Sequence, residues 1–177
     1  DYVVNVRWSE RGYSTLTGFD VSEFPAFPEV SEDSVLHMNA SELAFLVEKT
    51  AFAVSTDISR IAMSGVYLET ENNRVTMVGT DSHRLGLAAL DLENASLDQG
   101  VIISPKVLRN FLKSVPSDAV VEIRISQVYV LFLYDNVQMY SKLVEGKYVP
   151  YKNVIPQNFT HVIQVPTSEL INKIRCV

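Results

Sequence analysis

The sequence predicts an α+β fold in which a unit of one strand, one helix and three strands is repeated. Two segments, residues 43–50 and 107–115, carry apolar residues at helical spacing, and each follows a short apolar strand. Three segments rich in β-branched and aromatic residues then follow each helix. Leucines near the helix starts, Leu43, Leu108 and Leu170, recur at spacings of 65 and 62 residues. The chain is therefore expected to hold two complete half-units and the beginning of a third.

The first part of the chain is predicted to end an earlier copy of this unit. Residues 2–8 (YVVNVRW) have the composition of a strand, and residues 9–14 are expected to turn before a short extended piece that ends at Gly18. In residues 24–30, two prolines fix φ and remove backbone donors, which favours an extended connection over a strand or a helix. A domain boundary is expected at residues 31–33.

The first complete half-unit begins with a strand over residues 35–38. Asn39 and Glu42 have the spacing of a capping box, which satisfies free amides at the start of a helix. This helix is expected to run to about Val54. Its three strands are predicted at residues 61–70, 74–80 and 83–92, with a turn at residues 71–73 and a polar loop at residues 94–100.

The second half-unit repeats this order. After a strand at residues 101–103, Ser104 is expected to cap a helix, and Pro105 takes the first helical position, where its missing donor costs nothing. One face of this helix is apolar and consists of Val107, Leu108, Phe111, Leu112 and Val115. The following strands are predicted at residues 120–125, 129–134 and 138–142, with turns at residues 126–127 and 135–136.

A third copy begins near the end of the sequence. Residues 162–165 are predicted to form a strand, Thr167 to cap a helix and Glu169 to begin it. We therefore predict three parts, namely the last strands of one domain at residues 1–31, a complete domain at residues 32–158 and the start of a further domain at residues 159–177.

Composition excludes several classes of protein. With 177 residues, 47% of them hydrophobic, the chain can bury a sizeable core. The single cysteine, Cys176, rules out a disulfide framework and fits a reducing cytoplasm. No apolar run approaches the roughly 18 residues of a membrane span, and no signal peptide is expected. The net charge of −6 argues against a surface that coats nucleic acid, so any DNA contact must be local.

The most polar corner of the sequence is GTDSHRL, residues 79–85, which is predicted to turn between two strands. Asp81, Ser82 and His83 are the residue types of a hydrolytic triad, but neighbours on one strand point to opposite faces. The alternative is a turn in which Asp81 caps backbone amides and Arg84 pairs locally. The three histidines are too scattered to suggest a metal site, and there is no glycine-rich phosphate loop, so no catalytic residue, metal or cofactor is expected.

The GTDSHRL run, together with KLVEGKY at residues 142–148 and the segment 151–156, resembles the bacterial sliding clamp family, the beta subunit of DNA polymerase III. That family carries a Thr-Asp-Gly-His-Arg-Leu run and a later Lys-Leu-Val-Asp-Gly-x-Phe-Pro-x-Tyr run. The resemblance implies a DNA-clamp fold with two half-units per domain, helices on the inner channel face and sheets outside. It also implies a non-catalytic, cytoplasmic processivity factor in DNA replication, in which a ring of two three-domain subunits encircles duplex DNA regardless of its sequence.

The resemblance also implies a hydrophobic groove that binds short linear motifs, ending in Leu-Phe type residues, of the replicative polymerase, the clamp loader and repair proteins. The residues that match groove positions are Met63, Thr80, His83, Arg84, Leu85, Val149, Asn153 and Val154. Three features depart from the family pattern. Ser82 replaces a frequent glycine, Pro150 comes one residue late, and Asn153 stands where a basic residue is common.

Lys106, Arg109 and Lys113 lie on one face of the second helix and are the predicted DNA-facing residues. Lys106 and Lys113 match basic positions of the family, whereas Arg109 does not, and an ordinary solvated face is the alternative. The runner-up function is a β-rich hydrolase or small-ligand domain that uses Asp81 and His83. A monomer is expected for this segment, because the subunit contact of the family joins its first and third domains.

Overall fold

The computed structural model describes residues 2–30, 34–57 and 59–176. Its backbone contacts divide the chain into two compact units, Asp1–Lys147 and Tyr148–Val177, and each unit is described by itself. The boundary predicted at residues 31–33 lies outside the described residues. The division into domains at residues 1–31, 32–158 and 159–177 therefore stays a prediction.

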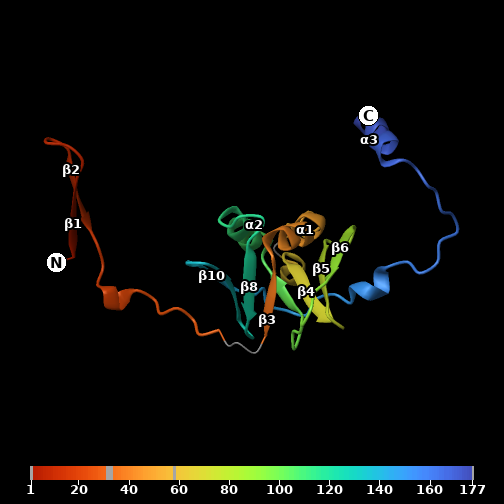
Figure 1. The fold of residues 1–177 in the computed structure, drawn as a ribbon, viewed down its shortest axis with the longest axis horizontal. Helices are drawn as coiled ribbons and strands as arrows, with labels where there is room; N and C mark the ends of the chain where they lie inside the picture. Colours follow the sequence, from red (N-terminus) through yellow and green to blue (C-terminus); the bar gives the residue numbers. More distant parts are fainter. Residues whose placement is uncertain (1, 31–33, 58, 177) are drawn as a thin grey trace. The chain divides into compact units, whose positions relative to one another are not determined.

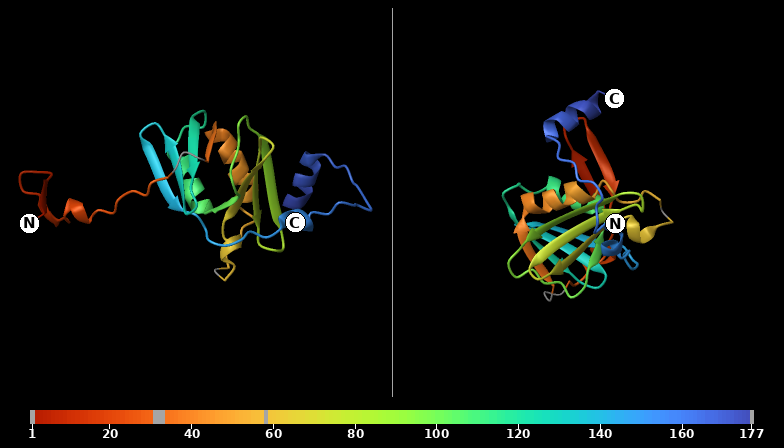
Figure 2. Two further views of the ribbon diagram at one scale, coloured as in Figure 1. Left: turned by 90° about the horizontal axis from the view of Figure 1, so that it is seen from below. Right: turned by 90° about the vertical axis from the view of Figure 1, so that its right-hand side faces the viewer.

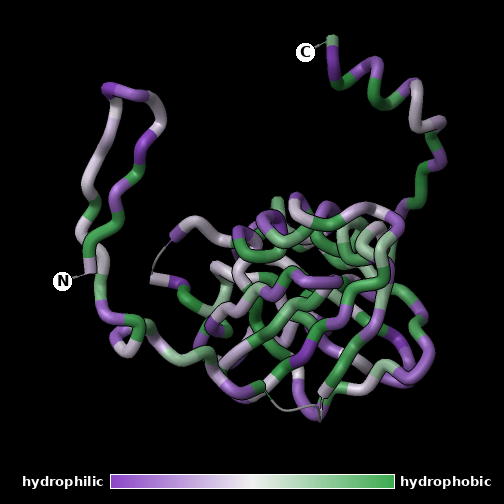
Figure 3. Tube along the Cα trace, turned by 60° about the vertical axis from the view of Figure 1, so that its left-hand side comes forward, coloured by the Kyte–Doolittle hydropathy of each residue, from purple (hydrophilic) through white to green (hydrophobic). Residues whose placement is uncertain are grey.

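The first unit begins with an antiparallel hairpin of β1 (Val3–Arg7) and β2 (Tyr13–Thr17). This pairing confirms the predicted strand, and it shows that the extended piece before Gly18 is the partner strand. The partner strand begins at Tyr13, so the turn predicted at residues 9–14 ends at Gly12. The trace of the hairpin includes hydrophobic stretches (Figure 3). Apolar side chains of both strands are exposed, among them Val4 and Leu16. The segment after the hairpin continues through a short 3-10 helix, Val21–Glu23, before the two prolines.

The first half-unit contains the five predicted elements. They are β3 (Val35–Asn39), α1 (Ala40–Thr50), β4 (Val66–Glu71), β5 (Arg74–Thr80) and β6 (Leu85–Asp91). The backbone N–H of Asn39 donates to Glu42 Oε2 at 2.8 Å, which confirms the capping interaction at the start of α1. Asn72 and Asn73 both adopt left-handed φ angles, of 52° and 60°, in the tight turn between β4 and β5.

Three predicted boundaries in this half-unit are wrong. Helix α1 ends at Thr50 and not at Val54. After Ala51 the hydrogen bonding changes to a tighter turn, in which Ala53 N donates to Thr50 O. Residues 61–63 form a 3-10 helix, Ile61–Met63, in place of a strand, because the amides of Met63 and Ser64 bond back to residues three positions earlier. Strand β6 begins at Leu85, so His83 belongs to the preceding turn.

The second half-unit has the same order of elements. They are β7 (Val101–Ile103), α2 (Pro105–Lys113), β8 (Val120–Ile125), β9 (Tyr129–Tyr134) and β10 (Val137–Lys142). Pro105 is the first helical residue as predicted, and Ser104 occupies the cap position without a side-chain capping bond. Leu43 and Leu108 are each the fourth residue of their helix and are fully buried, which confirms the repeat.

The two half-units exchange their first strands. One sheet has the order β10-β9-β8-β3 and the other β6-β5-β4-β7, so β3 pairs with β8 and β7 pairs with β4, both antiparallel. Helices α1 and α2 lie side by side on one side of these sheets (Figures 1 and 2). Because each sheet contains a strand from both half-units, one core cluster includes residues of both. Within the second half-unit, the ring centroids of Phe111 and Phe132 lie 5.1 Å apart in this core.

Two glycines let the end of α1 approach the second sheet. Gly79 of β5 and Gly86 of β6 are cross-strand partners. A Cβ atom at Gly79 would lie 2.2 Å from the carbonyl oxygen of Thr50, and one at Gly86 would lie 2.6 Å from that of Lys49. The last turn of α1 thus packs directly against the backbone of these two glycines, and this contact positions the turn that joins β5 to β6.

The second unit contains a 3-10 helix, Tyr151–Val154, and α3 (Thr167–Arg175). The strand predicted at residues 162–165 is wrong, because no described segment pairs with it. The helix begins as predicted near Glu169, but Pro166 and not Thr167 takes the cap position. Leu170 is again the fourth helical residue. The described helices reach at most 11 residues, too short to cross a bilayer.

Candidate functional site

The turn between β5 and β6 is closed by its own side chains. Thr80 is buried, and its hydroxyl donates to the carbonyl oxygen of Arg84 at 2.7 Å. The same hydroxyl oxygen accepts a hydrogen bond from Ser82 N at 3.2 Å. Thr80 therefore joins both arms of the turn, and this fixes the polar residues between them at the edge of the sheet.

Asp81 organises the backbone of the turn. Its Oδ1 accepts hydrogen bonds from the amides of His83 at 2.9 Å and Arg84 at 3.0 Å, and its Oδ2 accepts one from Arg84 Nε at 3.0 Å. The backbone amides of Arg84 and His83 stabilise the charged carboxylate and lower the pKa of Asp81 below its ordinary value. This geometry confirms the predicted turn, in which Asp81 caps amides and Arg84 pairs locally.

The same contacts argue against the hydrolytic alternative. In a triad the carboxylate orients the histidine ring, and that ring activates the hydroxyl. Here both carboxylate oxygens of Asp81 already bond to backbone and guanidinium, and Ser82 Oγ accepts a hydrogen bond from Arg60. Among the described residues, neither group forms a hydrogen bond with the His83 ring. A catalytic site built on Asp81 and His83 is not supported by this arrangement.

Arg60 is a site residue that the sequence did not reveal. Its Nη1 donates to the carbonyl oxygen of Asp81 at 3.1 Å and to the hydroxyl of Ser82 at 2.6 Å. Arg60 directly precedes the 3-10 helix Ile61–Met63, so these bonds bring that helix beside the turn. A separation of 21 and 22 residues within an irregular segment leaves no periodic signal that could have predicted the contact.

The Ile61–Met63 helix and the turn each contribute an apolar residue to what we name the floor, and the turn contributes two polar residues that we name its edges. Met63 and Leu85 are half-buried, whereas His83 and Arg84 are exposed. The guanidinium of Arg84 also lies 5.9 Å from the ring centroid of the exposed Phe52. Five of the predicted groove residues, Met63, Thr80, His83, Arg84 and Leu85, therefore belong to two neighbouring segments of the first unit. Such a surface suits an apolar side chain of a partner together with a polar backbone or carboxylate.

The other three predicted groove residues belong to the second unit. Val149 is half-buried and precedes the 3-10 helix Tyr151–Val154, and Asn153 and Val154 are exposed on that helix. Asn153 N donates to the carbonyl oxygen of Pro150 at 3.0 Å. Their assignment to the groove stays a prediction.

The three basic residues of α2 differ in what holds them. Lys106, Arg109 and Lys113 are all exposed. Arg109 Nη2 donates to the carbonyl oxygen of Ala51 at 3.3 Å, and thereby satisfies a free carbonyl at the end of α1. Neither lysine forms an ion pair with any residue that the structure describes. Lys106 and Lys113 thus remain available for an external anion, whereas Arg109 joins the two helices.

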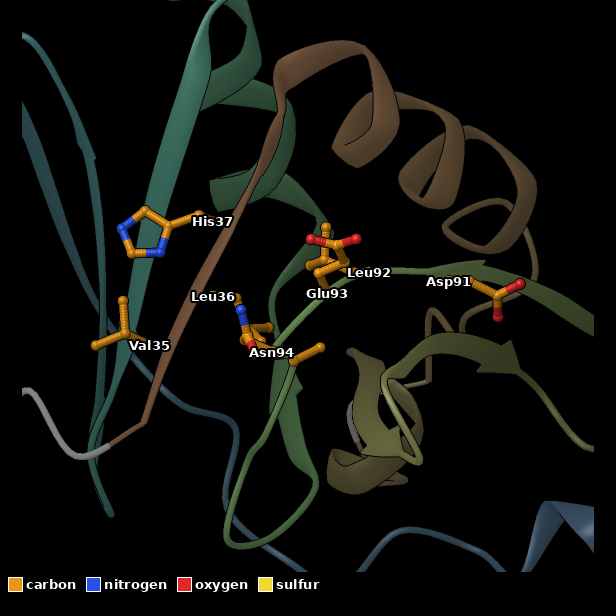
Figure 4. A pocket seen from close by; sticks show the side chains of 8 residues that line it. Val35, Leu36, His37, Asp91, Leu92, Glu93 and Asn94 are labelled. Atoms are coloured by element: carbon orange, nitrogen blue, oxygen red, sulfur yellow. The ribbon is translucent and has the colours of Figure 1, made fainter.

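Two pockets lie elsewhere in the first unit. One, of about 510 Å³, lies between β3 and the end of β6 and is lined by residues 35–37 and 91–95 (Figure 4). The other, of about 690 Å³, is lined by residues 27–30 together with Arg124, Leu131 and Tyr140. Neither includes a predicted site residue. Among the described residues, no three His, Cys, Asp or Glu side chains gather closely enough to hold a metal ion.

Comparisons with known proteins agree on one family. Residues 37–150 match the family described as DNA polymerase III beta subunit, central domain. The beta sliding clamp of Staphylococcus epidermidis is 34% identical over 145 residues, which are 81% of this chain and 38% of that protein. The beta sliding clamp of Staphylococcus aureus is 31% identical over 160 residues, which are 90% of this chain and 42% of that protein.

Solved structures give the same result. The DNA polymerase sliding clamp of Bacillus subtilis has a TM-score of 0.80 and 31% identity, over 89% of this chain and 42% of that one. The DNA polymerase III subunit beta of Pseudomonas aeruginosa also has a TM-score of 0.80, at 27% identity, over 89% of this chain and 44% of that one. The class of protein shared by these relatives is the sliding clamp. The chain belongs to the DNA polymerase III beta subunit family, and residues 37–150 correspond to its central domain.

These matches confirm the DNA-clamp fold and the family resemblance. The chain spans about two fifths of the length of the relatives it matches, between 38% and 44%.

Proposed function

We propose that this chain is part of a sliding clamp, a processivity factor that encircles duplex DNA and tethers the replicative polymerase. The observation that carries the proposal is the family match over residues 37–150 together with the interlocked half-units and the organised turn at residues 79–85. A ring raises the effective concentration of polymerase at DNA without reading sequence. The proposed protein is a non-catalytic, cytoplasmic accessory subunit, and its role needs no cofactor.

Within that function, we propose that the surface of Met63, Thr80, His83, Arg84 and Leu85 binds short linear motifs of the polymerase, the clamp loader and repair proteins. A half-buried floor with exposed polar edges supports this, since small binding sites combine apolar area with a few placed polar groups. Burying a Leu or Phe side chain contributes about 1.5–3 kcal/mol. Two such anchors without further groove residues correspond to an affinity of about millimolar.

A peptide titration followed by NMR tests this proposal. The peptide Gln-Leu-Ala-Leu-Phe added to the 177-residue chain is expected to shift the signals of Met63, His83 and Leu85 together and saturably. A simultaneous shift of Val154 would support its assignment to the same groove. Shifts confined to Asp81 and Ser82, or no saturable shift, would reject the groove.

Contact with DNA is proposed to run through Lys106 and Lys113. Each neutralised phosphate steepens the salt dependence of binding by roughly 0.9 in logarithmic units, so two lysines give a shallow slope of about −1.8. We expect weak binding of a fluorescent duplex at low salt, measured by anisotropy, and its loss in the variant Lys106→Glu, Lys113→Glu. The control Lys142→Glu, Lys147→Glu makes the same change of charge at two exposed lysines outside α2. Equal losses in both variants would show a general charge effect and no DNA-facing stripe.

Assembly is the last part of the proposal. The full-length protein is proposed to form a ring of two subunits, and this 177-residue segment to be a monomer. Analytical ultracentrifugation of both checks this, and a stable dimer of the segment alone would contradict it.

A further inference from the structure

Arg60 connects two segments of the first unit that meet at the proposed groove. Its Nη1 donates to Asp81 O at 3.1 Å and to Ser82 Oγ at 2.6 Å, and its Nε lies 3.6 Å from Asp57 Oδ2. One guanidinium nitrogen carries two N–H groups, so both hydrogen bonds of Nη1 form at the same time. The side chain therefore lies between an acid of its own segment and the top of the turn.

The position of Met63 depends on the position of Arg60. Met63 N donates to Arg60 O at 2.9 Å, and Arg60 N donates to Asp57 O at 3.1 Å. The carbonyl oxygen of Met63 accepts a hydrogen bond from Ser55 N at 2.8 Å. Ser59 bonds to Asp57 Oδ1 through both its amide and its hydroxyl, at 2.9 and 2.7 Å. These hydrogen bonds hold the segment that contains Asp57, Arg60 and Met63 together, and Arg60 hydrogen-bonds this segment to the turn.

Ser82 contributes the hydroxyl at an unfavourable backbone conformation. Its φ angle is 77°, in the left-handed region that a side chain disfavours and glycine adopts freely. Glycine at this position would relax the backbone but would offer no acceptor to Arg60. The serine therefore makes the backbone less stable locally than glycine would, but it adds a hydrogen bond between two segments.

We propose that Arg60 is a positioning residue for the proposed groove, acting through the Ser82 hydroxyl to hold Met63 in fixed relation to His83 and Leu85. The proposal rests on the peptide-binding function given above. When Met63, His83 and Leu85 already hold fixed positions, they lose less conformational freedom as a peptide binds. Arg60 thereby raises affinity without any direct contact to the peptide.

The test separates peptide affinity from stability. In the 177-residue chain, Ser82→Gly is expected to bind the Gln-Leu-Ala-Leu-Phe peptide about three- to tenfold more weakly, while its melting temperature stays the same or rises. Asn94→Gly is the matched control, because Asn94 also has a left-handed φ, of 57°, but lies in the loop after β6. It should melt like the wild type or higher and bind the peptide equally well. Ser82→Asn, which tolerates this backbone and keeps an acceptor oxygen, should recover affinity.

A second measurement needs no peptide. The amide of Met63 is expected to exchange its hydrogen faster in Ser82→Gly than in the wild type, and at the wild-type rate in Asn94→Gly. If Ser82→Gly keeps wild-type affinity, or if affinity follows melting temperature across the three variants, the positioning role is rejected. Unchanged exchange at Met63 rejects it as well. A wild type that binds no peptide rejects the proposed groove, and the exchange rates then still decide whether Arg60 holds Met63.

Discussion

The substitution Gly79→Ala is expected to lower the free energy of unfolding by about 3 kcal/mol or more, at or beyond the upper end of the usual cost of overpacking. The added Cβ would lie 2.2 Å from the Thr50 carbonyl oxygen and 3.0 Å from its carbon. Both atoms are backbone, so no side-chain rotation relieves the clash. The end of α1 must move away from β5, and α1 carries the fully buried core residues Leu43 and Leu46.

Urea unfolding monitored by circular dichroism measures this loss. Gly18→Ala is the matched control, because a Cβ there would meet its nearest atoms at 3.6 and 3.7 Å, an ordinary contact distance. This variant should unfold within about 1 kcal/mol of the wild type. If Gly79→Ala has the urea midpoint of the control, α1 does not approach β5 as closely as the structure shows.

The elements that the sequence predicted well are those with a local signal. Strand β5 was predicted at its observed bounds, because its alternating residues lie between the Asn72–Asn73 turn and the polar residues after Thr80. The starts of α1 and α2 were predicted from capping residues and from Pro105, which act within one turn of backbone. The exchange of β3 and β7 between sheets could not be predicted this way, because it depends on pairing between strands far apart in the sequence.

The errors have the same origin. The apolar sequence of Ile61–Met63 predicts a strand, but its backbone forms local hydrogen bonds in a 3-10 helix. Residues 51–54 continue the apolar pattern of α1, yet the helix ends at Thr50, whose hydroxyl bonds back to Leu46 O at 2.7 Å. At the candidate site, the bonds within the turn were predicted from Asp81 and Arg84, whereas the contact of Arg60 with that turn was missed. Sequence patterns thus predicted the interactions within one short segment and failed to predict those between two segments that are far apart in the sequence.

The substitution Met63→Lys is expected to abolish saturable binding of the Gln-Leu-Ala-Leu-Phe peptide. Met63 is half-buried beside the turn, so its replacement removes apolar area from the floor, and a Leu or Phe anchor that loses its partner gives up much of its 1.5–3 kcal/mol. The ammonium group would also lose water when the Leu and Phe side chains of the peptide cover it, and these apolar side chains offer it no compensating charge. Because the wild-type affinity is only about millimolar, a loss of this size leaves no binding that an NMR titration can detect.

Val128→Lys is the control for this experiment, since it introduces the same charge at an apolar residue that is 47% exposed in the turn between β8 and β9, in the other sheet. In Val128→Lys, the peptide should shift the NMR signals of His83 and Leu85 as it does in the wild type. The spectrum of Met63→Lys without peptide should keep the dispersed signals of a folded chain, because a half-buried residue can direct a long amine to solvent. A folded Met63→Lys variant that binds the peptide as well as the wild type would place the binding surface elsewhere than beside the Thr80–Leu85 turn.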